Sequence, residues 1–215
     1  MASLRKTSCY SKMKVVPYTR WSRRKQKAFI KMVPAQKIVK FSMGKGGEFN
    51  EGKLPLVLKL VNAEKVTVQV RHNAMEACRQ VLNKSLNEAL NGQFFLKVIP
   101  FPHHIQRENK MLTGAGADRM QTGMALSFGK AIAKAALLKK NAPLFLIAVS
   151  NEKGLQAGRA ALKEVNTKLP FKTRVEFTDL NQEKIKRAEI VANIKNSTIK
   201  KEKVTKEVKK TPSKK

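Results

Sequence analysis

The stretch KVTVQVRHNAMEACRQVLNKSLNEALNG, residues 65–92, changes its hydrophobic period partway along and so decides the fold class. In its first six residues valines alternate with polar residues, which predicts a strand with one apolar face. From His72 onward apolar residues recur every three or four positions, which predicts an amphipathic helix of about five turns. Asn73 could cap the start of this helix and Gly92 could close its end.

Further strands are predicted on both sides of this unit. The segments KIVKF (37–41), LPLVLKL (54–60) and FFLKVIPF (94–101) are rich in strand-forming residues. Farther along, AIAKAALL and LFLIAV could pair as strands around KKNAP (139–143). Because alanine and leucine also favour helices, AIAKAALL could equally continue a helix from Met120.

A second helix and a closing strand complete the predicted domain. EKGLQAGRAALKEVN (152–166) has helical spacing, and KTRVEF (172–177) reads as a strand. The resulting order of elements predicts an α+β fold, a two-layer sandwich of a mixed β-sheet with two helices.

Basic residues dominate the 215-residue chain, which has 45 Lys and Arg against 15 Asp and Glu and a net charge of +30. Residues 1–47 hold 13 of the basic residues and no acidic residue. The sequence predicts a basic N-terminal arm (1–32), a globular domain (33–180) with a central loop (102–124), and a lysine-rich C-terminal extension (181–215). Charge on this scale calls for a polyanionic partner, and nucleic acid is the commonest one.

Several other classes of protein fit the sequence poorly. Cys9 and Cys78 form no CxxC pair, which favours a reduced, intracellular chain. The longest apolar run, PLFLIAV (143–149), is far shorter than the roughly 20 residues that a membrane span needs, and no secretory signal is evident. An acid-free start is also typical of mitochondrial transit peptides, but Pro17 and Pro34 interrupt the amphipathic helix of such a peptide.

The glycine-rich stretch KMLTGAGADRMQTGM (110–124) fits neither common phosphate-binding template. A dinucleotide fingerprint would need a third glycine where Arg119 stands, and a P-loop ending at Lys130 would need glycine in place of Met124. What remains is a flexible basic segment. Run out and back, residues 105–119 could reach roughly 20 to 25 Å from the domain, a reach that suits folded RNA. Its flexibility is expected to come from three glycines, Gly114, Gly116 and Gly123.

No catalytic or metal site is predicted. His103 and His104 have no nearby cysteine or paired carboxylate, so contact with RNA is preferred to a metal site. Asp118 is explained as an acid at the positive end of a short helix. Tyr18 and Trp21, set among arginines, could stack on bases or cover the edge of the domain. We therefore predict no enzyme activity, no cofactor and no metal.

The segment PHHIQRENKMLTGAGADRMQTGM (102–124), followed by SFGK, resembles the central signature of the universal ribosomal protein family called L-sixteen in bacteria and L-ten-e in archaea. Supporting motifs lie in the same order along the chain, namely PYTR (17–20), VPAQKIVKFSMG (33–44) and VRHNAMEACR (70–79). The resemblance covers about residues 3–178 and is closest to the archaeal form.

This resemblance implies an α/β hammerhead fold and a structural role in the large ribosomal subunit. Such proteins bind large-subunit rRNA beside the peptidyl-transferase centre, among neighbouring ribosomal proteins, and their central loop points toward the acceptor end of tRNA. They are not catalysts, so we expect this chain in cytoplasmic ribosomes and not as a homo-oligomer. The residues expected to face RNA are Tyr18, Arg20, Arg23, Arg24, Arg71, His72, His103, His104, Arg107, Lys110, Arg119 and Lys130.

Two features depart from the family pattern. After SFGK the family usually continues with Pro-Gly, whereas this chain has Ala131 and Ile132, and the insertion WSRRKQKAFIKM (21–32) is unusually basic. The lysine-rich tail beyond about residue 180 lies outside the resemblance and could either thread RNA or stay solvated. The alternative to a ribosomal role is a free nucleic-acid-binding protein or an organelle-targeted nucleotide-binding enzyme.

Overall fold

The computed structural model of the chain describes residues 17–20, 22, 24–30, 32–109, 114–115 and 129–181. Residues 1–177 form one compact unit and residues 178–215 a second, of which only residues 178–181 are described. The first unit holds the helices and strands that build the core.

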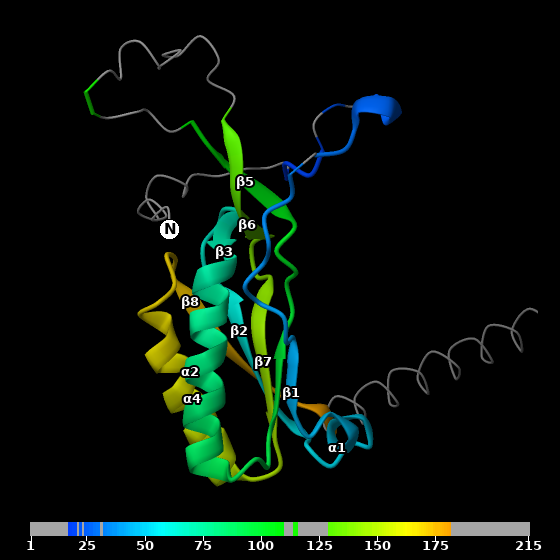
Figure 1. Cartoon of the computed structure of the whole chain (residues 1–215). Helices are drawn as coiled ribbons and strands as arrows, with labels where there is room; N and C mark the ends of the chain where they lie inside the picture. The colour runs from blue at the N-terminus through cyan, green and yellow to red at the C-terminus, as the bar shows by residue number, and fades with distance from the viewer. Residues whose placement is uncertain are drawn as a thin grey trace, which may run out of the picture. The chain divides into compact units, whose positions relative to one another are not determined.

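The described strands form two antiparallel sheets (Figure 1). One has five strands in the order β1-β4-β7-β2-β8, and the other has three in the order β3-β6-β5. The α+β class is confirmed, with two sheets in place of one mixed sheet. The elements are η2 (Lys25–Lys27), β1 (Ser42–Gly44), α1 (Gly46–Asn50), β2 (Leu56–Asn62), β3 (Val68–Arg71), α2 (His72–Leu90), β4 (Phe95–Val98), β5 (His104–Glu108), β6 (Lys130–Leu138), β7 (Pro143–Val149), α4 (Glu152–Asn166) and β8 (Thr173–Asp179).

Helices α2 and α4 occupy the residues that their hydrophobic spacing predicted. The capping of α2 differs from the prediction, because Arg71 precedes the helix in an extended conformation and Asn73 lies inside the first turn. At the other end Asn91 adopts the left-handed conformation, and its N–H donates to the carbonyl of Asn87 at 3.0 Å. Gly92 follows with a φ of 81°, so both residues contribute to the C-terminal cap.

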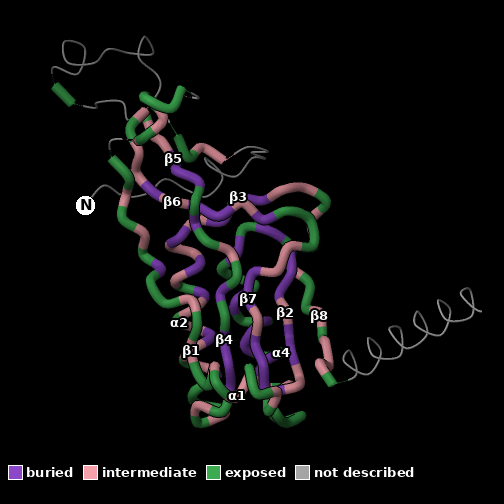
Figure 2. Tube along the Cα trace, turned by 90° about the vertical axis from the view of Figure 1, so that its right-hand side faces the viewer, coloured by how far each residue is buried: buried purple, intermediate pink, exposed green. Residues whose placement is uncertain are grey.

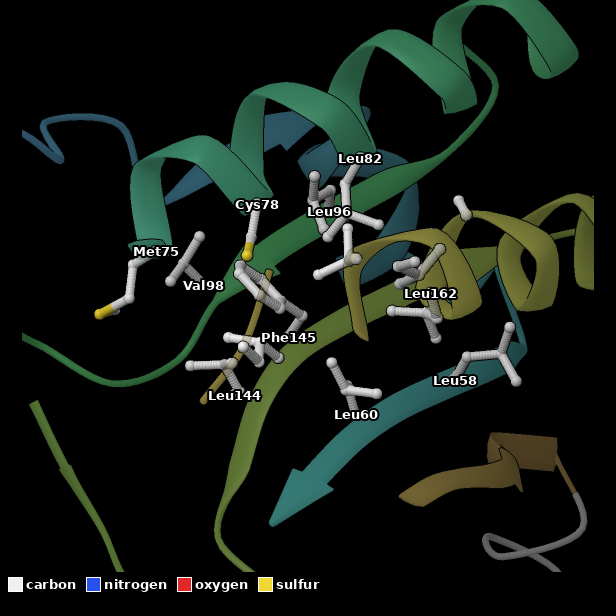
Figure 3. Packing of buried hydrophobic residues seen from close by; sticks show 14 of the residues in the cluster. Leu58, Leu60, Met75, Cys78, Leu82, Leu96, Val98, Leu144, Phe145 and Leu162 are labelled. Atoms are coloured by element: carbon white, nitrogen blue, oxygen red, sulfur yellow. The ribbon is translucent and has the colours of Figure 1, made fainter. Parts of the chain in front are cut away.

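The core lies between the five-stranded sheet and the two long helices. Figure 3 shows Leu82 of α2 and Leu162 of α4 pointing into the same cluster as Leu58 and Phe145 of the sheet. Helix α4 can approach the sheet closely because residue 158 is glycine. A Cβ at Gly158 would lie only 2.8 Å from Leu58 Cδ1. Figure 2 shows that the central strands β7 and β2 are mostly buried, whereas the edge strand β8 is not.

The strand predicted at residues 37–41 is wrong, because β1 begins at Ser42. Two backbone groups in this segment are bound by side chains instead of a neighbouring strand. The N–H of Lys37 donates to His72 Nδ1 at 3.1 Å, and Gln36 Nε2 donates to the carbonyl of Ile38 at 2.8 Å. Such local bonds compete with a strand ladder.

Strands β6 and β7 belong to different sheets, so the hairpin predicted between them is wrong. The fully buried Asn62, at the end of β2, holds the chain at this corner. Its Nδ2 donates to the carbonyls of Val66, Leu138 and Lys139 at 3.2, 3.4 and 3.2 Å. These bonds fix the point at which the chain leaves the three-stranded sheet and enters the five-stranded one.

The segment predicted as an irregular central loop begins with a strand, β5, which pairs with β6. Its period could not be recognised, because His104, Ile105 and Gln106 are buried in succession and two of them are polar. The pairing also decides the structure of residues 131–138, which form a strand between β3 and β5 and not a helix.

Candidate nucleic-acid interface

Strands β5 and β6 lie side by side (Figure 1), and their pairing ends at Glu108 opposite Lys130, with the basic Arg107 just before Glu108. Arg107 lies opposite Ala131, and the pairing register shifts between Gln106 and Arg107. Such a shift is a β-bulge, which re-aims the side chains that follow it. We call residues 107–109 and 129–131 the neck.

The neck is closed by a glycine that no other residue can replace without rearrangement. Gly129 has a φ of 75°, and a Cβ on it would lie 2.8 Å from the carbonyl carbon of Glu108. L-residues rarely adopt this conformation, and the contact leaves no space for a side chain. The SFGK motif therefore carries its glycine for a close backbone approach.

A segment of the N-terminal arm is bound along β5. The N–H of Tyr18 donates to His104 Nδ1 at 2.8 Å, and the N–H of Ile105 donates to the carbonyl of Tyr18 at 2.9 Å. The Arg107 guanidinium lies 4.3 Å from the centre of the Tyr18 ring, in a cation–π contact. The structure thus brings together three residues predicted to face RNA, Tyr18, His104 and Arg107.

Two of the predicted RNA-facing histidines are buried and hold the N-terminal segment in place. His104 is 0% exposed and His72 is 4% exposed. Each accepts a backbone N–H through Nδ1, from Tyr18 and Lys37 respectively. The expectation that these imidazoles lie on the surface is therefore corrected. Sequence could not reveal this, because each bonding partner lies at least 35 residues away.

The His72 contact is expected to make folding depend on pH. Burial lowers the pKa of His72 below its ordinary value of 6.5, and the nearby charges of Lys37, Lys134 and Arg71 lower this pKa further. The unfolded chain therefore takes up the proton more readily, so stability is lost as pH falls through about 6.5 and levels off below the folded-state pKa. Denaturant unfolding between pH 8 and pH 5 measures this loss, and His72→Gln should flatten the curve. Parallel curves for the two proteins would contradict it.

The other predicted residues are distributed as follows. Arg20, Arg24, His103 and Lys130 are exposed, and Arg71 is half-buried at the end of β3. Gly114 is exposed, with a φ of 144° and open space around the position of a Cβ. Arg23, Lys110, Arg119, Gly116 and Gly123 lie outside the described residues, as does the helix predicted to start at Asp118.

A groove beside the neck has no counterpart among the sites predicted from the sequence. A hollow of about 810 Å³ opens between the N-terminal arm and the neck, and we call it the arm groove. Its apolar lining comes from Tyr18, Phe29, Ile30 and Met32. The only available signal was the spacing of apolar residues within the basic WSRRKQKAFIKM insertion, which has no regular period.

The described residues contain no group of three or more His, Cys, Asp or Glu side chains placed to hold a metal ion. Burial raises the pKa of the Cys78 thiol to about 12, so this cysteine stays protonated and packs as a core residue. None of the helices in the described part of the chain combines the length and apolar character needed to cross a membrane.

Comparison with known proteins gives one consistent family. The family model described as ribosomal protein L16p/L10e matches residues 17–176. The large ribosomal subunit protein uL16 of Sulfolobus acidocaldarius is 41% identical over 182 residues, which cover 84% of this chain and 97% of that protein. The same-named protein of Metallosphaera sedula is 37% identical over 183 residues, covering 84% and 98% of the two chains. That of Saccharolobus islandicus is 36% identical over 179 residues, covering 82% and 94%.

The matched region includes both sheets and the neck, apart from the last residues of β8. It also includes the N-terminal segment from Pro17 that is bound to β5 and α2. The resemblance predicted from the sequence is confirmed, and the chain belongs to the L16p/L10e family of ribosomal proteins.

Proposed function

We propose that this chain is a structural, non-enzymatic constituent of the large subunit of cytoplasmic ribosomes. In this proposal it binds rRNA near the peptidyl-transferase centre, contacts neighbouring ribosomal proteins, and helps to position tRNA through the central loop at 102–124. Family membership supports the ribosomal role, since relatives matched over almost their whole length are named large ribosomal subunit proteins. The division into an arm (1–32), a domain (33–180) and an extension (181–215) is part of the proposal.

The observation that carries the proposal is the construction of the neck. Arg107 is the second-last residue of β5, and Lys130 is the first residue of β6, where it lies opposite Glu108. Strand β6 also pairs with β3, which anchors both strands to the domain. Binding residues are often placed on loops that a rigid scaffold holds in position. The neck therefore gives the proposed contacts of Arg107 and Lys130 a fixed base. Lys110 and Arg119 are part of the same proposal and lie outside the described residues.

Affinity is expected to come mainly from phosphate neutralisation. The chain has 30 more basic than acidic residues, and residues 1–47 contain no acidic residue. Tyr18, within that stretch, is bound to β5 beside the neck. Each phosphate contact releases condensed counterions, which makes binding weaken as salt rises. RNA shape and base stacking would then select the site.

Removing the two neck cations should reduce the salt dependence of RNA binding. For Arg107→Ala combined with Lys130→Ala, the slope of log affinity against log salt should decrease in magnitude by roughly 1 to 2, because each lost phosphate contact contributes about 0.7 to 0.9. The measurement is filter binding of the purified protein to a large-subunit rRNA fragment across a salt series.

A matched control removes one lysine and one arginine from the helices. Lys84 and Arg159 are exposed on α2 and α4, so Lys84→Ala with Arg159→Ala changes the net charge equally without touching the neck. This variant should keep the wild-type slope. If the slope decreased equally in both variants, the neck would not be the RNA interface. Loss of the wild-type protein from large subunits during a high-salt wash would count against the ribosomal role itself.

A further inference from the structure

We propose that the arm groove binds one unpaired nucleobase of the RNA partner, stacked against the aromatic lining, with the adjoining phosphate held by the cations of the groove. This inference rests on the proposed RNA-binding function and adds to it a specific subsite. The subsite lies between the N-terminal arm and the neck, with its aromatic side chains supplied by the arm.

The lining of the groove is apolar on its walls and cationic beside them. Phe29 and Met32 keep 64% and 80% of their surface exposed, although burying such side chains is normally favourable. Lys27, Arg107 and Lys130 also line the groove, and no acidic side chain joins them among the described residues. A ligand that fits the groove should therefore have a flat apolar part and, next to it, an anionic group.

The Arg107 guanidinium is already oriented before any ligand binds. It lies over the Tyr18 ring at 4.3 Å while also lining the groove. The Tyr18 backbone is itself fixed by two hydrogen bonds to β5, at 2.8 and 2.9 Å. An arginine restrained by a cation–π contact loses less freedom on binding, and its planar fork matches a phosphate group.

These features favour an unpaired nucleotide over a duplex. A duplex keeps its bases stacked inside and offers phosphates and groove edges, whereas loops and bulges can turn single bases outward onto aromatic side chains. A hollow of about 810 Å³ is within the size range of small-ligand sites, so it can enclose one base with its sugar. An acidic peptide with an aromatic residue has related chemistry, and the test includes it.

The test uses the full-length protein and two probes, a single-stranded RNA 12-mer carrying 2-aminopurine and a 12-base-pair RNA duplex. Phe29→Ala should weaken binding of the single strand by roughly 5- to 100-fold, since base–aromatic stacking is sensitive to such truncation. It should also abolish the quenching of 2-aminopurine fluorescence that stacking produces. Affinity for the duplex and both salt slopes should stay unchanged, because no charge is altered.

Two control variants separate stacking from general damage. Phe29→Tyr keeps an aromatic ring and should retain most of the single-strand affinity. Phe177 on β8 is 47% exposed and does not line the groove, so Phe177→Ala should behave as the wild type. Equal weakening by the Phe29→Ala and Phe177→Ala variants would overturn the subsite.

The remaining outcomes distinguish failure of the nucleobase subsite from failure of RNA binding as a whole. If Phe29→Ala leaves single-strand binding and quenching unchanged while the neck variant still reduces the salt slope, the subsite is wrong and RNA binding stands. If neither probe binds with a salt-dependent affinity, the proposed function fails. A glutamate- and tyrosine-containing peptide that binds the wild type but not Phe29→Ala, with RNA unaffected, would assign the groove to a protein partner instead.

Discussion

Replacing Gly44 by alanine is expected to lower the free energy of unfolding by roughly 2 to 5 kcal/mol, through backbone strain and overpacking together. Gly44 has a φ of 82°, and a Cβ on it would lie 2.1 Å from the carbonyl oxygen of Phe94. That oxygen already accepts the N–H of Lys45 at 2.9 Å. The added methyl group can be accommodated only if β1 moves away from β4. Urea unfolding followed by circular dichroism measures the loss.

Two other glycines separate the causes of this loss. Gly92 also has a positive φ, of 81°, but has open space where a Cβ would be, so Gly92→Ala should show the strain alone, about 1 to 2 kcal/mol. Gly47 lies in α1 with open space and no unusual φ, so Gly47→Ala should be neutral or stabilising by up to about 1 kcal/mol. A Gly44→Ala loss no greater than that of Gly92→Ala would show that the close approach to Phe94 is not real.

Phe145→Ala should be destabilising by about 3 to 5 kcal/mol, because the fully buried ring would leave a cavity that the sheet cannot close. Phe145 lies on β7 between Leu60 of β2 and Val98 of β4. Both neighbours belong to the same core cluster, which the helices cover. Thermal and urea unfolding would report the change.

The matched control for this core prediction is Phe29→Ala. It removes the same side chain from a position that is 64% exposed, so its effect on stability should stay within about 0.5 kcal/mol. A large loss in this variant would mean that the arm packs against the domain through Phe29. A small loss for Phe145→Ala would contradict the assignment of β7 to the centre of the core.

The two long helices could be predicted from sequence because their information is local. In α2 and α4 the apolar spacing of consecutive turns already identifies the buried face. The strands were harder. Residues 37–41 have the composition of a strand. The backbone N–H of Lys37 is instead bound by His72, 35 positions away, so local composition does not predict the structure here. Likewise, β6 and β7 are neighbours in sequence but pair with strands of different sheets, and the side chain of Asn62, about 76 residues earlier, bonds the carbonyls between them.

Only part of the candidate interface could be predicted from the sequence. Charge and motif singled out Arg107 and Lys130, since a basic residue at the start or end of a glycine-rich segment is visible in the sequence. The burial of His104 could not be seen, because it depends on Tyr18, 86 residues earlier. The arm groove is lined by residues of the N-terminal arm and of the neck, which are far apart in sequence, so only the folded chain reveals it.

The dependence of the N-terminal segment on His72 and His104 has a consequence for synthesis. A ribosome making this chain releases Tyr18 long before it releases the imidazole that Tyr18 binds. During that interval Tyr18, which lies within the acid-free first 47 residues, has no β5 to bind. An early part of the polypeptide therefore reaches its hydrogen-bonded position only after a much later part has been made.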